Sequence, residues 1–252
     1  MSEVDWDSRA RQGVGFQSVI DPADRSGLKN GLIDRIQWDH IGPWAERRRS
    51  VLDFGCGIGR FAQRIVAAGA SYCGVDASAA MIDSARQLHP GGAVTFLHAP
   101  GLPLPLADGR FDGCLTVGVL QCLKTSDGAP LRAAVAELAR VLLPGGELLI
   151  IEQASASGRF SGSVTDSSTE QDYEDALGAC FQVADLRRIR CGSLSRLSAW
   201  YLRGGSMLPV RRRIEGYLAR HEATIASRSD AAALRAQVYY DVAIRAVKRA
   251  GV

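Results

Sequence analysis

The sequence predicts an α/β fold in which a doubly wound, mostly parallel seven-stranded sheet carries helices on both faces. Short apolar runs alternate with segments of helical periodicity, the pattern of repeated strand–helix units. A glycine-rich loop directly follows the first apolar run, and glycine and proline turns separate later ones. The chain has 252 residues, 46% of them hydrophobic, which is enough for one large domain with its own core.

Each of the first four predicted strands is a short apolar run that ends in a turn or a helix. These strands are Val51–Phe54, Ser71–Val75, Val94–Leu97 and Phe111–Val117, with helices expected over Phe61–Ala68 and Ala79–Leu88. Ser78 is a typical N-cap for the second helix, because its hydroxyl can accept a hydrogen bond from a free backbone N–H. Residues 1–50, with apolar side chains at helical spacing, are expected to form an N-terminal helical cap.

The second half of the chain adds three predicted strands. A helix over Leu131–Leu142 leads through Pro144-Gly145-Gly146 into the strand Glu147–Ile151. The sixth strand is expected at Phe181–Arg190, after a Ser/Gly-rich loop at 155–169 and a short helix at 172–179. The seventh is expected at 238–247. Residues 193–236 have helical spacing, so we expect a helical insertion between the sixth and seventh strands, and a main domain made of 51–192 and 237–252.

Charge is distributed unevenly along the chain. The formal net charge is only +3, which by itself argues neither for nor against a nucleic-acid partner. From Asp185 onward, however, there are 14 Lys and Arg against 5 Asp and Glu, whereas the preceding residues have a net charge of −6. Aromatic residues are sparse among the arginines of this basic part, so we expect no nucleic-acid partner.

Composition also bounds the expected location of the protein. No apolar run approaches the roughly 18 residues that a membrane span needs, so no membrane association is predicted. The acidic start lacks the features of a signal peptide. Six cysteines occur without a CxxC pair and mostly within apolar runs, which predicts a reduced cytoplasmic protein with buried thiols and no metal site.

The strongest chemical signal is the segment Asp53-Phe54-Gly55-Cys56-Gly57-Ile58-Gly59 after a buried strand. Glycines at such a loop let a ligand approach the backbone closely. A second acid, Asp76, ends the next strand, where a carboxylate can accept hydrogen bonds from both hydroxyls of a ribose. Asp53 would repel a pyrophosphate but suits an ammonium group, so a cationic nucleoside fits better than a dinucleotide. An NAD-binding oxidoreductase is the alternative from another class.

In this loop and four later motifs the chain resembles the small-molecule, type 11-like branch of class I S-adenosylmethionine-dependent methyltransferases, which have a Rossmann-like fold. The five motifs follow one another between residues 50 and 152. They are Val51-Leu52-Asp53-Phe54-Gly55-Cys56-Gly57-Ile58-Gly59-Arg60, Gly74-Val75-Asp76-Ala77-Ser78 with Met81, Asp108-Gly109-Arg110-Phe111-Asp112, Val117-Gly118-Val119-Leu120, and Leu142-Leu143-Pro144-Gly145-Gly146-Glu147-Leu148.

The resemblance implies S-adenosyl-L-methionine as cofactor and S-adenosyl-L-homocysteine as product. It implies that Asp53 lies near the ammonium group of the methionine moiety and that Asp76 holds the ribose hydroxyls. The remaining implied contacts are Gly55, Gly57, Gly59, Val117, Gly118 and Leu120 at the methionine end, and Ala77 and Met81 beside the adenine. N-terminal segments of such enzymes often cover the cofactor, which makes Trp6, Arg9 and Lys29 candidates there.

One departure from the family concerns the adenine. Relatives usually have an Asp after the third strand that accepts from the adenine amino group. Here the matching stretch is Ala99-Pro100-Gly101-Leu102, which has no carboxylate. We therefore expect Pro100, Gly101 and Leu102 to hold the adenine through backbone groups and apolar packing.

The sequence favours methyl transfer to a small molecule, with O-methylation of a sugar or a natural-product scaffold first and N-methylation of an amino sugar or related amine second. A catalytically silent cofactor-binding module is a further alternative, because no general base is evident. His98, His221 and Tyr240 are the weak candidates for that role.

The arginines of the predicted insertion have two interpretations. They form either a solvated helix face or a lid whose cations meet an anionic acceptor. The apolar residues Leu194, Leu197, Trp200, Tyr201 and Leu208 would form the inner face of such a lid or a homodimer contact. The arginines are Arg196, Arg203, Arg211, Arg212, Arg213, Arg220, Arg228 and Arg235.

Overall fold

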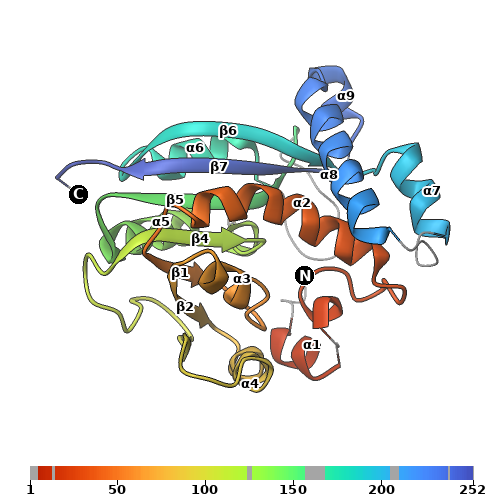
Figure 1. Ribbon diagram of the computed structural model, residues 1–252. Helices are drawn as coiled ribbons and strands as arrows, with labels where there is room; N and C mark the ends of the chain where they lie inside the picture. The colour runs from red at the N-terminus through yellow and green to blue at the C-terminus, as the bar shows by residue number, and fades with distance from the viewer. Residues whose placement is uncertain are drawn as a thin grey trace.

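The computed structural model describes residues 5–12, 15–123, 127–156, 168–204, 210–237 and 239–251. Its seven-stranded sheet has the strand order β3-β2-β1-β4-β5-β7-β6 (Figure 1). The strands are β1 (Ser50–Phe54), β2 (Ser71–Asp76), β3 (Val94–His98), β4 (Phe111–Val117), β5 (Leu142–Ala154), β6 (Phe181–Cys191) and β7 (Tyr240–Lys248). Neighbours among β1 to β5 pair in parallel, whereas β7 is antiparallel to both β5 and β6. The predicted α/β class and mostly parallel sheet are confirmed.

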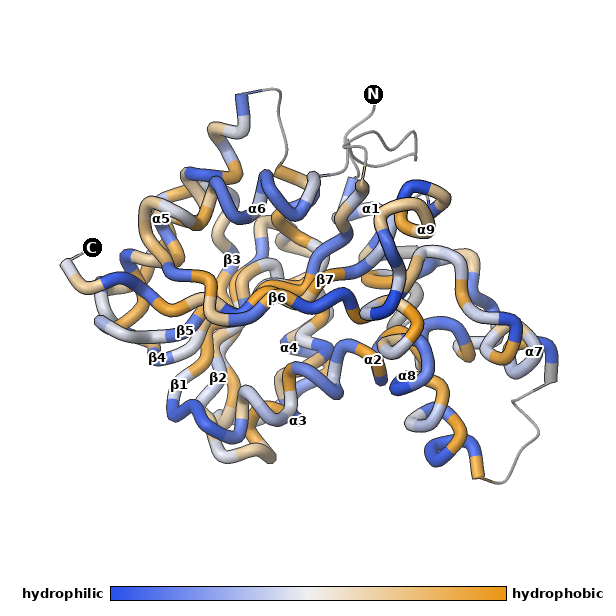
Figure 2. Tube along the Cα trace, turned by 90° about the horizontal axis from the view of Figure 1, so that it is seen from above, coloured by the Kyte–Doolittle hydropathy of each residue, from blue (hydrophilic) through white to orange (hydrophobic). Residues whose placement is uncertain are grey.

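Helices lie on both faces of this sheet (Figures 1 and 2). The α-helices of the described residues are α1 (Trp6–Gln12), α2 (Leu28–Ala45), α3 (Ala62–Ala67), α4 (Ala79–Leu88), α5 (Ala129–Val141), α6 (Glu170–Leu177), α7 (Arg196–Gly204), α8 (Arg211–Arg228) and α9 (Ala231–Arg235). Short 3-10 turns occur at η1 (Gly15–Ser18) and η2 (Leu120–Leu123). No described helix is long and apolar enough to cross a membrane.

Two hydrophobic cores result, one on each face. Successive strand residues point to opposite faces of a sheet. In β4, Cys114 accordingly packs in the core under α5 and α6, and its neighbour Leu115 in the core under α2, α3 and α4. The central strands are apolar on both sides for this reason, as expected for a sheet covered on both faces.

Local signals predicted several element boundaries correctly. Helix α4 spans Ala79–Leu88, and the Ser78 hydroxyl caps it by accepting a hydrogen bond from the backbone N–H of Met81 at 3.1 Å. The start of β5 was predicted too late, at Glu147, whereas its pairing with β4 begins at Leu142. The predicted turn at Pro144–Gly146 lies within an irregular stretch of this strand. Most of the loop expected at 155–169, and Val238 at the start of the expected last strand, lie outside the described residues.

The segment 193–236 is packed onto the main sheet domain. Helix α8 contacts β6 and α2, and it buries Leu218, Ala219 and Ala226. The lid proposed for this segment also included Leu208, which lies outside the described residues. At the other end of the chain, α1 contacts α4.

Candidate functional site

A cavity of about 490 Å³ opens at the carboxyl ends of β1, β2 and β4, the usual ligand position in such sheets. The residues that line it come mainly from the ends of these strands and the loops after them, from the loop after β3, from α1 and α4, and from the segment after η1. They include Trp6, Val19, Asp53, Gly55, Gly57, Arg60, Asp76, Ala77, Met81, Pro100, Gly101, Leu102, Val117, Gly118 and Cys122. Most of the sequence-predicted cofactor residues thus meet in one cavity.

Gly57 shows why this loop needs glycine. Its φ of +53° lies in the left-handed region that L side chains rarely adopt. A Cβ at this position would come within 2.8 Å of Cγ1 of Val19, which also lines the cavity. Both the backbone conformation and the space therefore exclude a side chain here.

Asp76 ties the end of β2 to this loop. Its Oδ2 accepts a hydrogen bond from the backbone N–H of Gly57 at 2.8 Å, and its Oδ1 accepts from the backbone N–H of Ser78 at 2.8 Å. Burial raises the pKa of Asp76, while these N–H groups counteract the shift. Each carboxylate oxygen has two lone pairs, so both can accept further hydrogen bonds from a ligand in the cavity.

Asp53 is the second acid of the cavity and is almost completely buried. The hydroxyl of Tyr72 donates to its Oδ2 at 2.7 Å. Burial raises the pKa of Asp53 to about 6, although Tyr72 and Arg60 favour its charged form. A cationic ligand group in this cavity would therefore replace lost solvation of the Asp53 carboxylate.

The adenine-side residues expected from the sequence form an apolar wall. Ala77, Met81, Pro100, Gly101 and Leu102 all line the cavity. Asp53 and Asp76 are its lining carboxylates among the described residues, and neither belongs to the loop after β3. This wall suits a flat heterocycle held by apolar packing.

Helix α1 closes this region from the N-terminal side. The Ser78 hydroxyl and the backbone N–H of Ala80 both donate to Oδ1 of Asp7, which anchors α1 on the start of α4. Trp6, one residue earlier, lines the cavity. The structure thus brings Trp6 to the site, as expected from the sequence.

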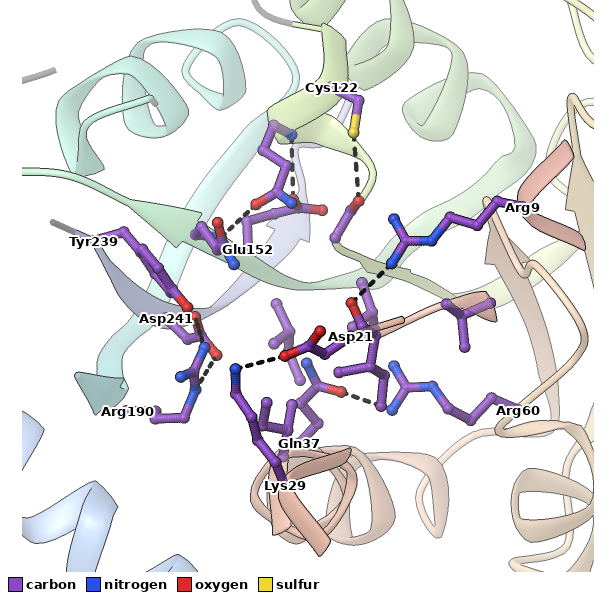
Figure 3. Close-up of a pocket in the computed structure, with 18 of the residues that line it drawn as sticks. Arg9, Asp21, Lys29, Gln37, Arg60, Cys122, Glu152, Arg190, Tyr239 and Asp241 are labelled. Carbon is purple, nitrogen blue, oxygen red and sulfur yellow. Dashed lines mark hydrogen bonds and ion pairs between the residues drawn. The ribbon is translucent and has the colours of Figure 1, made fainter. Parts of the chain in front are cut away.

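Figure 3 shows the residues that line a second cavity, of about 350 Å³. Its lining is more polar and includes charged residues from α1, α2, β5, β6 and β7. The two cavities share the residues Trp6, Val19, Arg60, Val117, Gly118 and Cys122. A molecule in the second cavity would therefore meet a molecule in the first at the end of β4.

Glu152, at the end of β5, lines the second cavity and was not singled out from the sequence. It is 1% exposed, and its carboxylate accepts hydrogen bonds from the backbone N–H groups of Val119, Leu120 and Gln121 at 2.8–3.2 Å. Burial raises its pKa to about 7, against the effect of these hydrogen bonds. Glu152 therefore holds the β4–η2 loop in place beside both cavities.

Several residues predicted for the site lie elsewhere. Gly59 and Leu120 line neither cavity: a Cβ at Gly59 would come within 2.6 Å of the Phe96 ring, and Leu120 is fully buried in the core. The three candidate bases are also outside both cavities. His98 is exposed beside the Ala77 carbonyl, His221 stacks on Tyr217 in α8, and Tyr240 is buried in the core.

The interpretation of Cys122 also needs correction, and the two interpretations of the arginines can be compared with the structure. Cys122 was expected to be a buried core thiol, yet it is exposed and lines both cavities. Its pKa is raised to about 12, first by desolvation and then by Glu152, so it stays a neutral thiol. Of the two interpretations of the arginines of 193–236, the solvated helix face agrees with the structure, because none of the described ones lines either cavity and all but Arg211 are exposed. Arg9 and Lys29, which were expected to cover the cofactor, line the second cavity and not the first.

A glycine loop between Asp53 and Asp76, at the carboxyl edge of a Rossmann-like sheet, is the arrangement typical of ligand sites in doubly wound α/β domains. A family model described as "Methyltransferase domain" matches residues 52–150. Over these residues the chain is similar to the type 11 methyltransferase family.

Curated relatives are similar to this chain over about half of its length. A protein of Mycobacteroides abscessus named "Uncharacterized methyltransferase" is 38% identical over 128 residues, covering 50% of this chain and 47% of the relative. A malonyl-[acyl-carrier protein] O-methyltransferase of Erwinia billingiae is 35% identical over 146 residues, covering 55% and 54%. The chain spans about half the length of the curated relatives it matches.

Solved structures share the fold. The PH0226 protein of Pyrococcus horikoshii OT3 has a TM-score of 0.58 at 14% identity, covering 88% of this chain and 91% of that protein. The geranyl diphosphate C-methyltransferase of Streptomyces coelicolor A3(2), solved with S-adenosyl-L-homocysteine, has a TM-score of 0.56 at 17% identity, covering 91% and 86%. The [4+2]-cyclase SpnF also has this fold, with a TM-score of 0.55 at 20% identity, covering 94% and 97%, so the fold alone does not define the reaction.

Proposed function

We propose that this protein transfers a methyl group from S-adenosyl-L-methionine to a small-molecule acceptor. The observation that carries the proposal is the meeting of Asp53, Asp76 and the glycine loop in one cavity of about 490 Å³. This size is within the roughly 300–1,000 Å³ of small-molecule sites. The family match over residues 52–150 supports the same cofactor.

The residues present fit this cofactor group by group. Asp76 offers lone pairs to ribose hydroxyls, and Asp53 offers a negative charge to the methionine ammonium. The apolar wall formed by Ala77, Met81 and Leu102 suits the adenine. NAD fits less well, because its pyrophosphate would face the carboxylate of Asp53.

When bound, the cofactor supplies an already activated methyl group, so the protein has to position the acceptor and exclude water. Val117 and Gly118 line both cavities, so they would lie beside the point where the methyl group passes from the cofactor to the acceptor. Glu152 fixes the backbone that follows them. With a pKa of about 7, Glu152 is also in the range suited to accepting a proton near neutral pH.

Oxygen is the acceptor atom that we favour, on a sugar or natural-product scaffold. The Erwinia relative is an O-methyltransferase by name, which supports this choice. Incubation with S-adenosyl-L-methionine labelled in its methyl group, and a panel of matched hydroxyl and amine acceptors, tests it. Label on hydroxyl compounds supports O-methylation; label only on amines favours N-methylation. Binding of S-adenosyl-L-homocysteine without transfer to any acceptor would favour a silent cofactor-binding module.

A further inference from the structure

The second cavity contains four cationic side chains, three of which already have carboxylate partners. The pairs are Lys29 with Asp21 at 2.6 Å, Arg60 with Asp34 at 2.9 Å, and Arg190 with Asp241 at 2.8 Å. The Arg190–Asp241 pair is bidentate and both side chains are buried. The carboxylate partners therefore compensate most of the positive charge of these three cations.

Arg9 of α1 is the fourth cation, and no carboxylate in the described part of the chain forms an ion pair with it. Its Nη2 donates to the backbone carbonyl of Ile20 at 3.0 Å, while its Nε is buried and has no hydrogen-bond partner. Asp21 is near enough to favour the charged form of Arg9, but its carboxylate accepts a hydrogen bond from Lys29 instead. The backbone carbonyl of Asp21 accepts a hydrogen bond from the side chain of Asn30. A guanidinium has five N–H donors, so Arg9 is poorly satisfied.

The place of Arg9 in the cavity is also informative. Its guanidinium lies 5.1 Å from the ring centroid of Trp6, which lines both cavities. Its charge also partly offsets the raised pKa of Cys122, another shared residue. Arg9 therefore lies close to the border between the two cavities, within reach of a molecule that would receive the methyl group.

The charges around this cavity leave Arg9 without an ion-pair partner among the described residues. Asp21, Asp34 and Asp241 balance the three paired cations, so Arg9 and Glu152 remain. The Glu152 carboxylate is already bonded to backbone N–H groups, and burial raises its pKa to about 7, which reduces its negative charge near neutral pH. Gln37, Gln121 and Gln153 add neutral hydrogen-bonding groups. Such a cavity suits a polar molecule with one anionic group.

We propose that the second cavity binds an acceptor bearing an anionic oxygen group, a carboxylate or a phosphate, and that Arg9 binds this group. The anion would provide the missing partner of Arg9 through charge-assisted hydrogen bonds. This inference rests on the proposed function and names the substrate class of the same site. It also assigns the recognition of the anion to α1 instead of the arginine-rich segment 193–236.

Calorimetric titration of the full chain with benzoate, inorganic phosphate and neutral benzamide tests this assignment, both with and without saturating S-adenosyl-L-homocysteine. We expect the wild type to bind one of the two anions but not benzamide. Stronger binding of benzoate identifies a carboxylate acceptor, and stronger binding of phosphate identifies a phosphorylated one. Arg9→Gln should weaken anion binding at least about tenfold, and Arg9→Lys less. Arg11→Gln, an exposed position on the same helix, should leave it unchanged.

The outcomes separate this inference from the proposed function. Failure of the wild type to bind either anion, or unchanged anion binding by Arg9→Gln, would overturn the role of Arg9. The affinity for S-adenosyl-L-homocysteine, measured on the same variants, also reports whether Arg9→Gln is folded. Absence of S-adenosyl-L-homocysteine binding in the wild type would contradict the cofactor assignment, whatever the anions do.

Discussion

The carboxylate of Asp76 accepts a hydrogen bond from the backbone N–H of Gly57, with 2.8 Å between Oδ2 and the nitrogen. The bond joins the end of β2 to the loop after β1, so the two parts of the cofactor cavity are held in a fixed relation. The same carboxylate also receives the backbone N–H of Ser78. The Asp76 carboxylate is therefore already oriented in the ligand-free protein, which would reduce the entropic cost of binding a ligand hydroxyl.

Gly57→Ala should impair cofactor binding. Forcing a Cβ into a left-handed conformation costs roughly 1–2 kcal/mol, and this Cβ would also collide with Val19. We expect the affinity for S-adenosyl-L-homocysteine, measured by calorimetry, to fall at least about tenfold. Gly69→Ala is a matched control, because Gly69 has a φ of +101° but no atom within 4 Å of its built Cβ. It should lose stability and keep its affinity; equal losses of affinity in both variants would refute a specific role of Gly57.

Asp53 predicts a pH dependence of cofactor affinity. With a pKa of about 6, its carboxylate is charged at pH 7.5 and largely protonated at pH 5. Attraction for the ammonium of the ligand should therefore weaken below pH 6, by up to about tenfold per pH unit. Calorimetric titrations between pH 5 and 8 measure this. Asp53→Asn should bind more weakly at pH 7.5 and show a flatter profile; a variant with the wild-type profile would exclude Asp53 from the ammonium contact.

The same carboxylate should affect the stability of the ligand-free protein. Its pKa in the folded state is raised above the ordinary 3.8, so the folded state holds the proton more tightly between about pH 4 and pH 6. The contribution of Asp53 to the free energy of unfolding is therefore fully present below about pH 4 and is lost as the pH rises through about 6. The melting temperature of Asp53→Asn relative to wild type should thus increase from pH 4 to pH 7. A constant difference would contradict the raised pKa.

Asp7 anchors α1 on α4 through the Ser78 hydroxyl and the Ala80 N–H. Asp7→Ala should release α1 and open the side of the cavity that Trp6 covers. We expect a roughly three- to tenfold loss of S-adenosyl-L-homocysteine affinity and faster amide hydrogen exchange at residues 6–12. Asp83→Ala is the control, because it removes a carboxylate of α4 that forms only an exposed ion pair with Arg86 at 3.6 Å. This variant should change neither the affinity for S-adenosyl-L-homocysteine nor the hydrogen exchange of α1. Unchanged exchange in Asp7→Ala would show that other contacts hold α1.

The sequence predicted features whose signals are local. Ser78 marked the start of α4, and the acids at the ends of two apolar runs, Asp53 and Asp76, line one cavity. The antiparallel direction of β7 was not predicted, because apolar residues recur in the same way in parallel and antiparallel buried strands.

Contacts between distant residues escaped the sequence reasoning for a different reason. The bond from Tyr72 to Asp53, and those from the β4–η2 loop to Glu152, join positions 19 and 31 to 33 residues apart. The local pattern does not show which side chains form hydrogen bonds across such separations. The histidines failed as candidate bases for the opposite reason: residue type alone suggested them, and the fold places His98 and His221 outside both cavities.

Titration of S-adenosyl-L-homocysteine and, separately, NAD into wild type and Asp76→Ala decides whether the cavity is a cofactor site of the kind described. We predict that the wild type binds S-adenosyl-L-homocysteine and not NAD, and that Asp76→Ala loses at least about tenfold in affinity because the ribose hydroxyls lose their acceptor. Binding of NAD in place of S-adenosyl-L-homocysteine, or full affinity in Asp76→Ala, would contradict the account.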